Sequence, residues 1–343
     1  MLRLHQAWET RVPAEGGGIL LSDLRTGRLL RLRGDTARWQ SLFRLLGEGA
    51  DEQDLGDVLW PAARVALDYL RDEGALVSRE LGVITDAAFD RQIRFFDLYE
   101  TGELSGTDLH ERLRDSRVVL VGLGGYGVWL ATLLSRMGVR DLVGVDDDEV
   151  ELSNLHRQFL YTRDDVGRHK AAVCAERLES FTPVVERVTD PGRFAELVSG
   201  ADLVVNAFGY GLPDERHEHP RTFHTVARGC ELAGTPSLTF GGSWHGPLRV
   251  PGTAGACAGC LTMTEPFRSR LVHHPRPVLR SPAPAMPARL GINASICAWE
   301  AARHLSGMGT PLRSAAAVLD TIDYTTMRLV PLERVAGCVV CGE

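Results

Sequence analysis

Apolar and polar positions alternate in strand fashion near the start of the chain, over residues 16–23 and 27–33. After Asp35, a residue type that favours helix N-termini, the apolar spacing becomes helical. The predicted helices are 35–46, 51–59 and 61–73, and a short apolar ending follows at 74–77. Two or three strands followed by three helices indicate a small winged-helix domain over residues 1–83.

From residue 116 onwards, short apolar runs alternate with amphipathic helical stretches. The predicted strands are 117–122, 142–146, 201–206 and 237–240, with a helix at 126–137. This alternation is typical of an α/β fold with a doubly wound, mostly parallel, Rossmann-like sheet. We therefore expect a domain at 116–343, joined to the first module by a polar connector at 84–115.

Charge and composition exclude some classes of function. The chain has 343 residues, a net charge of −7 and a pI near 5.9, which argues against general binding to nucleic acids or membrane surfaces. The helices of the first module are acidic, so a peptide added to a sheet edge fits this module better than DNA does; a structural cap is the alternative. No apolar run is long enough to span a membrane and no signal peptide is evident, which predicts a cytoplasmic protein.

A glycine-rich turn follows the first predicted strand of the α/β domain. Its glycines, which let backbone N–H groups approach phosphate at a helix N-terminus, are Gly122, Gly124, Gly125 and Gly127. The second strand ends at Asp146 and is followed by Asp148, where a carboxylate would meet ribose hydroxyls. This combination predicts an adenine nucleotide, either NAD or ATP.

The segment after the second strand favours ATP. It carries Asn154, Arg157 and Gln158, and then Lys170, the only lysine in the chain. Arg157 and Lys170 suit attack on the α-phosphorus of ATP, in which negative charge builds on phosphoryl oxygens and on departing pyrophosphate. A dehydrogenase builds up no such charge on its cofactor's phosphates, so it has no need for these two cations. The alternative is a solvated polar loop.

Four of the seven cysteines form two CxxC pairs, Cys257/Cys260 and Cys338/Cys341. Such pairs favour a structural, tetrahedral zinc site over two redox pairs or a chance arrangement. The other cysteines, Cys174, Cys230 and Cys297, are interpreted as buried apolar residues. Between the CxxC pairs, residues 261–290 contain six prolines and five arginines, which predicts a long, basic, mobile loop before helical patterning resumes at 293–305.

Taken together, these motifs resemble the ThiF/MoeB superfamily of adenylate-forming enzymes, which includes the ubiquitin-activating enzymes. The similarity runs from about Phe89 to Cys341. It implies that Asp146 holds the ribose, that Asn154, Arg157 and Lys170 hold the phosphates with Mg²⁺, and that Gln158 belongs to the same site. It also implies a homodimer in which Arg91 reaches the partner subunit's ATP.

The order of the domains looks most like the MccB branch, whose members adenylate peptides in ribosomal natural-product (RiPP) biosynthesis and carry a small peptide-recognition domain before the core. Residues 1–83 would then be a PqqD-like (RRE-like) domain that holds the leader of a precursor peptide. Two departures stand out. Gly209 occupies the family's usual Mg²⁺-binding Asp position, so Asp214 or Asp148 would have to replace it, and residues 261–290 contain no cysteine for a thioester relay.

Three hypotheses follow. The leading one is an ATP-dependent adenylyltransferase that activates a carboxylate or amide of a ribosomally made precursor peptide. The second is a catalytically degenerate leader-peptide-binding scaffold that serves a separate cyclodehydratase, which Gly209 would favour and the Arg157/Lys170 pair would not. The third is an adenylyltransferase for a sulfur-carrier protein.

Overall fold

The computed structural model describes residues 1–80, 82–84, 86–208, 219–242, 244–265, 267, 285–319 and 327–342. The chain forms two compact units, Met1–Glu111 and Arg112–Glu343. Among the residues described, no helix is both long and apolar enough to cross a membrane.

The first unit contains the strands and helices that the pattern predicts, together with short strands at its two ends. Its strands are β1 (Arg3–Leu4), β2 (Trp8–Arg11), β3 (Gly18–Asp23), β4 (Leu29–Arg33) and β5 (Leu76–Val77). Its helices are α1 (Thr36–Glu48), α2 (Glu52–Val58), α3 (Pro61–Asp72), the 3₁₀ turn η1 (Ala87–Phe89) and α4 (Asp90–Asp97), and α5 (Gly106–Arg114) follows. The resemblance of this unit to a winged-helix domain stays a prediction.

Local chemistry explains where these helices begin. The Asp35 side chain accepts hydrogen bonds from the backbone N–H groups of Ala37 and Arg38, as the sequence predicts, and so caps α1. Asp51 and Asp54 form a reciprocal capping box at α2. The apolar faces of the helices meet the inner face of the sheet, where residues such as Ile19 are buried.

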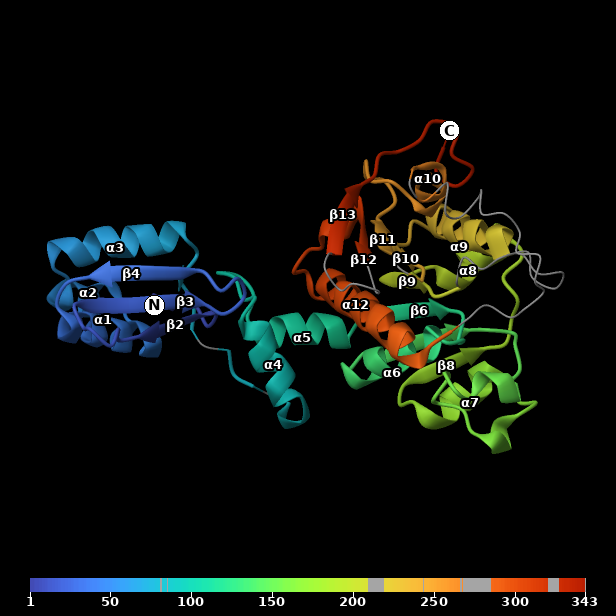
Figure 1. Ribbon diagram of the computed structural model, residues 1–343, viewed down its shortest axis with the longest axis horizontal. Helices are drawn as coiled ribbons and strands as arrows, with labels where there is room; N and C mark the ends of the chain where they lie inside the picture. Colours follow the sequence, from blue (N-terminus) through green and yellow to red (C-terminus); the bar gives the residue numbers. More distant parts are fainter. Residues whose placement is uncertain are drawn as a thin grey trace. The chain divides into compact units, whose positions relative to one another are not determined.

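β4 is an edge of its sheet, because the three strands run in the order β2-β3-β4. Asp23 N–H donates to Arg28 O at 2.9 Å, and Gly34 N–H donates to Gly17 O at 3.2 Å. Since bonded pairs alternate along an antiparallel ladder, the backbone groups of Leu29 and Arg31 point away from β3. Helix α3 lies along the same side of the sheet (Figure 1), tied to it where Arg28 pairs with Glu73.

A buried ion pair fastens the segment just after α4 to the start of the chain. Arg3 and Glu100 side chains are each 1% exposed and bond to each other through two guanidinium nitrogens. Glu100 also accepts from the backbone N–H of Gln6 at 3.1 Å, and its carbonyl oxygen contacts the His5 ring at 3.0 Å. These bonds place residues 90–100 within the first unit rather than in a loose connector.

The second unit is an α/β domain. Its strands are β6 (Arg117–Val121), β7 (Asp141–Val145), β8 (Phe181–Val184), β9 (Leu203–Asn206), β10 (Ser237–Phe240), β11 (Trp244–Arg249), β12 (Ala315–Leu319) and β13 (Met327–Pro331). Its helices are α6 (Gly127–Arg136), α7 (Lys170–Arg177), α8 (Pro191–Val198), α9 (His219–Ala233), α10 (Ala258–Met263) and α12 (Pro287–Ser306). Three 3₁₀ turns complete it: η2 (Leu152–Asn154), η3 (Arg163–Asp165) and η4 (Pro311–Arg313).

These strands form one sheet in the order β13-β12-β11-β10-β9-β6-β7-β8. Strands β10, β9, β6, β7 and β8 are parallel, whereas β11, β12 and β13 pair in antiparallel fashion. The expectation of a mostly parallel sheet therefore holds for one half only, and the sheet is mixed. Since β6, β9 and β10 run in the same direction, the segments that follow them lie at one edge of the sheet, where α/β proteins bind ligands.

Helices cover both faces of this sheet (Figure 1). On one face, valines of β6, β7 and β9 pack against Phe194 and Val198 of α8 and against Val226 and Cys230 of α9. On the other face, α6 packs against α12. The three single cysteines, Cys174, Cys230 and Cys297, are buried and unpaired, as predicted.

The predicted loop at 261–290 is shorter than expected. Its first residues belong to α10, and α12 begins at Pro287 rather than at residue 293. Pro287 lies in the first turn of α12, where a proline has no hydrogen bond to lose. The basic residues 268–284, on which the prediction of mobility rested, lie outside the described part of the chain.

Candidate nucleotide site and cysteine cluster

The glycine-rich turn connects β6 to α6 and has no room for a side chain at Gly127. Gly122 has a φ of +91°, which favours glycine. A Cβ on Gly127 would lie 1.9 Å from the carbonyl oxygen of Gly122, and one on Gly125 would lie 2.8 Å from Leu290. The turn is therefore tightly closed on itself and lies against the start of α12.

Asp146, the first residue after β7, is 5% exposed and holds this turn in place. Its carboxylate accepts from the backbone N–H of Leu123 at 2.5 Å and from that of Asp148 at 2.8 Å. Burial raises the pKa of Asp146, while the nearby Lys170 opposes that rise. The aspartate thus lies beside the glycine-rich turn, where the sequence predicts a ribose ligand.

Lys170 begins α7 and is almost fully buried, which is unusual for lysine. Its Nζ donates to Asp148 Oδ2 at 2.6 Å, and its backbone N–H donates to the Asp148 carbonyl oxygen at 3.0 Å. The structure therefore brings together Lys170, Asp148 and Asp146, as expected.

The segment after β7 carries three further predicted residues, of which Arg157 and Gln158 lie beside the turn. Asn154 is buried and its Oδ1 accepts from the Glu151 N–H at 3.2 Å. The guanidinium of Arg157 donates to Ser153 O at 2.7 Å, and its aliphatic part lies 3.7 Å from the position of a Cβ on Gly125. Gln158 is buried next to Gly124, and its Oε1 accepts no hydrogen bond from the described residues. Burial lowers the pKa of Arg157.

Sequence reasoning missed two aromatic residues that shape the site. Tyr161 is buried, and its hydroxyl donates a hydrogen bond to Leu123 O at 2.9 Å, which anchors the glycine-rich turn. Phe208 lies 3.2 Å from the position of a Cβ on Gly122. It also lines a small cavity of about 50 Å³ beside the three aspartates that follow β7. No local motif marks either residue, because each becomes relevant only through long-range packing.

Three predicted positions are not placed in this site. Arg91 is exposed on α4 of the first unit, so its predicted role in a partner subunit stays a prediction. Gly209 and Asp214, on which the Mg²⁺ prediction depends, lie outside the described residues. The carboxylates of Asp146, Asp147 and Asp148 come within 4.8 Å of one another, so a cation fits the described donor set.

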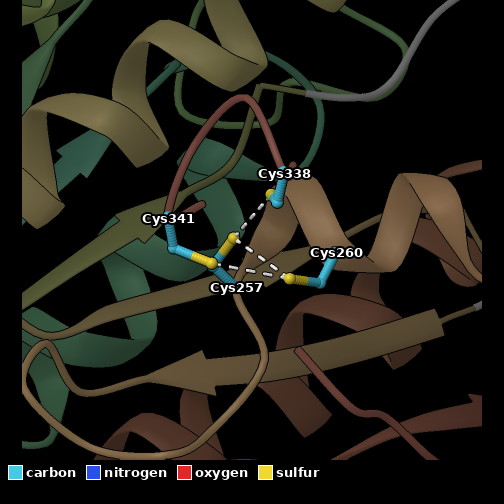
Figure 2. A group of neighbouring side chains, drawn as sticks. All are labelled: Cys257, Cys260, Cys338 and Cys341. Carbon is cyan, nitrogen blue, oxygen red and sulfur yellow. Dashed lines mark hydrogen bonds between the residues drawn. The ribbon is translucent and has the colours of Figure 1, made fainter. Parts of the chain in front are cut away.

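The two CxxC pairs meet although they are far apart in the sequence (Figure 2). Cys257 and Cys260 flank the start of α10, and Cys338 and Cys341 lie in the C-terminal turn. The Sγ–Sγ distances are 3.8 Å for Cys257–Cys260, 3.6 Å for Cys257–Cys338 and 3.5 Å for Cys260–Cys341. Four thiolates at about 2.3 Å from one tetrahedral ion would lie roughly 3.8 Å apart, so the cluster fits a metal such as zinc.

Comparison with known proteins places this geometry in a family. The model of the ThiF family matches residues 89–340. The sulfur carrier protein adenylyltransferase of Thermus thermophilus is 33% identical over 257 residues, which cover 69% of this chain and 86% of the relative. The sulfur carrier protein ThiS adenylyltransferase of Escherichia coli is 30% identical over 74% of this chain and 94% of the relative.

Solved structures show the same fold over a longer stretch. Escherichia coli MccB with MccA-N7isoASN has a TM-score of 0.76 at 18% identity and covers 100% of this chain and 99% of its own. PaaA has a TM-score of 0.67 at 18% identity and covers 96% of this chain. The chain therefore belongs to the ThiF family and is an ATP-dependent adenylyltransferase of the ThiF/MoeB type.

Proposed function

We propose that this adenylyltransferase activates a carboxylate or amide of a ribosomally made precursor peptide in natural-product maturation, with the leader of that peptide held by the first unit. One observation carries the proposal. Most of the first unit precedes the family match, which begins at residue 89, and this unit has an open sheet edge at β4.

The β4 edge suits an extended peptide. The outward backbone groups of Leu29 and Arg31 can pair with an added strand, which supplies affinity independent of side chains. Exposed apolar side chains accompany this edge: Leu29 is 66% exposed, and Val65 and Tyr69 of α3 are 71% and 43% exposed. Exposed apolar residues next to an unpaired edge usually mark an interaction site.

The proposed chemistry follows from the charges of the site. An oxygen of the peptide carboxylate attacks the α-phosphorus of ATP, and the bond from that phosphorus to the departing pyrophosphate breaks. Arg157 and Lys170 would stabilise the charge that builds up, together with Arg91 from the partner subunit of a homodimer. Bound Mg²⁺ would neutralise phosphate charge, with Asp148 as the described carboxylate nearest to Lys170.

Solved relatives of the same fold support a peptide acceptor. The structures of MccB include complexes with MccA and with N-formylated MccA. A second candidate, a sulfur-carrier protein as acceptor, is favoured by the named activities of the two sequence relatives. A scaffold for a cyclodehydratase is the third candidate, and it would bind a leader peptide without consuming ATP.

The experiment uses the full chain, ATP with Mg²⁺, and the synthetic product of each short reading frame adjacent to the gene. Mass spectrometry should detect an AMP adduct of one such peptide, or a product derived from it, with release of pyrophosphate. Adenylation of a sulfur-carrier protein in place of every peptide would overturn the proposal in favour of the second candidate. Peptide binding without pyrophosphate release would favour the scaffold.

A further inference from the structure

A line of buried hydrogen bonds joins helix α7 to the glycine-rich turn through Tyr161. The hydroxyl of Tyr161 donates to Leu123 O at 2.9 Å, and its oxygen lies 3.4 Å from Cys174 Sγ on α7. Burial raises the pKa of the Cys174 thiol to about 12, so the thiol keeps its hydrogen. Since a carbonyl oxygen can only accept, the tyrosine hydrogen goes to Leu123 and the thiol hydrogen goes to Tyr161. The direction of both bonds is therefore fixed.

A second path connects the same peptide unit to the same helix. The backbone N–H of Leu123 donates to Asp146 Oδ2 at 2.5 Å, and Asp146 Oδ1 accepts from the Asp148 N–H at 2.8 Å. Asp148 Oδ2 in turn accepts from Lys170 Nζ at 2.6 Å. Lys170 begins α7, and Cys174 follows it by about one helical turn. The two paths therefore close a ring that leaves α7 at Lys170 and returns to it at Cys174.

The two paths differ in what a bound nucleotide would do to them. The path through Asp148 ends at the Lys170 ammonium group, for which the phosphates of ATP would compete. The path through Tyr161 contains a thiol, a hydroxyl and a carbonyl, none of which a phosphate would displace. This second path can therefore keep the turn and α7 in register both before and after ATP binds.

We propose that Tyr161 is a positioning residue for the nucleotide: its hydroxyl sets the distance between the glycine-rich turn and Lys170, so that both meet the phosphates of one ATP. Tyr161 is 3% exposed and acts through Leu123 and α7 rather than by touching ATP. Without the hydroxyl, the turn would spend part of its time out of register with Lys170, and ATP would bind only the fraction in register. This inference rests on the phosphate role proposed for Lys170 and is independent of the acceptor.

The test uses Y161F in the full chain, a substitution that removes one oxygen atom and keeps the ring. Calorimetry measures the Kd of ATP with Mg²⁺ and, by competition, the Kd of adenosine, which has no phosphate. Loss of one buried hydrogen bond changes a two-state population by about tenfold, so Y161F should raise the Kd of ATP by about tenfold. The Kd of adenosine should change by less than about twofold, because adenosine does not need Lys170.

A double-mutant cycle tests whether Tyr161 acts through Lys170. K170A should itself weaken ATP binding by about tenfold or more, because it removes a charge-assisted contact. With the ammonium group gone, its register with the turn no longer matters, so adding Y161F to K170A should change the Kd of ATP by less than about twofold. Y99F, which removes a tyrosine hydroxyl in the first unit, is the matched control and should leave both affinities unchanged.

Three results would overturn the inference. Equal weakening of ATP and adenosine in Y161F would show that the tyrosine supports the fold of the whole site, whatever happens to Tm. Unchanged ATP binding in Y161F would show that the hydroxyl is dispensable. An equal loss of ATP affinity from Y161F with and without Lys170 would show that it does not act through the lysine.

Failure of the role proposed for Lys170 has a separate signature. ATP binding that is unchanged in K170A would remove that role, and the positioning role of Tyr161 would fall with it. The adenosine comparison and the double-mutant cycle are independent, so either one decides where the other involves binding too weak to measure.

Discussion

The ammonium group of Lys170 lies 2.6 Å from Asp148 Oδ2, and the two partners differ in exposure. The lysine side chain is 7% exposed and the aspartate side chain 47%. The lysine ammonium group is thus buried in the protein, while the carboxylate of Asp148 that it bonds is exposed to solvent. An incoming polyphosphate carries more negative charge than one carboxylate, so it can compete with Asp148 for Lys170 without moving the lysine far.

Replacement of Lys170 by alanine should lower turnover by roughly 10²–10³-fold, which is typical for loss of one preorganised electrostatic contact. ATP–pyrophosphate exchange with the acceptor peptide, the one that the enzyme adenylates, measures the effect. R193A is the matched control, because Arg193 is an exposed cation of the same unit on α8. A loss smaller than tenfold in K170A would contradict the role of Lys170 in charge stabilisation.

The open edge of β4 predicts a contrast between two substitutions at one position. R31P removes an outward backbone N–H without removing a bond to β3, whereas R31A changes only the side chain. Calorimetric titration with the unmodified precursor peptide should show about tenfold weaker binding for R31P and little change for R31A. Equal affinities of the two variants would show that the leader does not bind along the edge of β4.

The cysteine cluster predicts about one zinc ion per chain, bound by four thiolates. C338S and C341S should lose the metal and melt at a lower temperature, because the ion joins the C-terminal turn to α10. C297S, which changes a buried cysteine outside the cluster, should keep the metal. Elemental analysis after gel filtration decides this, and zinc content unchanged in C338S would exclude the site.

Acid should destabilise the wild-type protein through His245. Burial lowers the pKa of this imidazole from 6.5 to about 4, so the folded state binds fewer protons than the unfolded chain between those values. The free energy of unfolding therefore falls as the pH falls through this window, by about 3 kcal/mol for a shift of this size. Urea unfolding from pH 7 to pH 4 should show a loss in the wild type that is smaller in H245F by about this amount; His5, His224 and His304, whose pKa values burial also lowers, contribute to the loss in both proteins.

Local patterns predicted the elements whose residues carry strong periodicity, but not those defined by distant partners. The apolar runs at β6, β7, β9 and β10 were found where predicted. By contrast, β12 consists of Ala-Ala-Ala-Val-Leu, which favours helix by propensity, and it is a strand only because β11 and β13 pair with it.

The same distinction applies to the site. Motif spacing pointed to the glycines and Asp146, and its being the only lysine, together with the family resemblance, pointed to Lys170; the structure brings these residues together. Tyr161 and Phe208 lie against the glycine-rich turn from other parts of the chain and share no motif, so their place in the site could not be read from the sequence.

The buried pair of Arg3 and Glu100 bears on how such enzymes can be recombined. The family match begins at residue 89, yet Glu100 is neutralised by an arginine at the start of the chain. A fusion cut at the family boundary would leave Glu100, just after α4, as an uncompensated buried charge, at a cost of about 3–5 kcal/mol. Exchange of the N-terminal module between relatives should therefore succeed when the segment through Glu100 travels with it, and an evolutionary graft of this module would have had to bring its own copy of that segment.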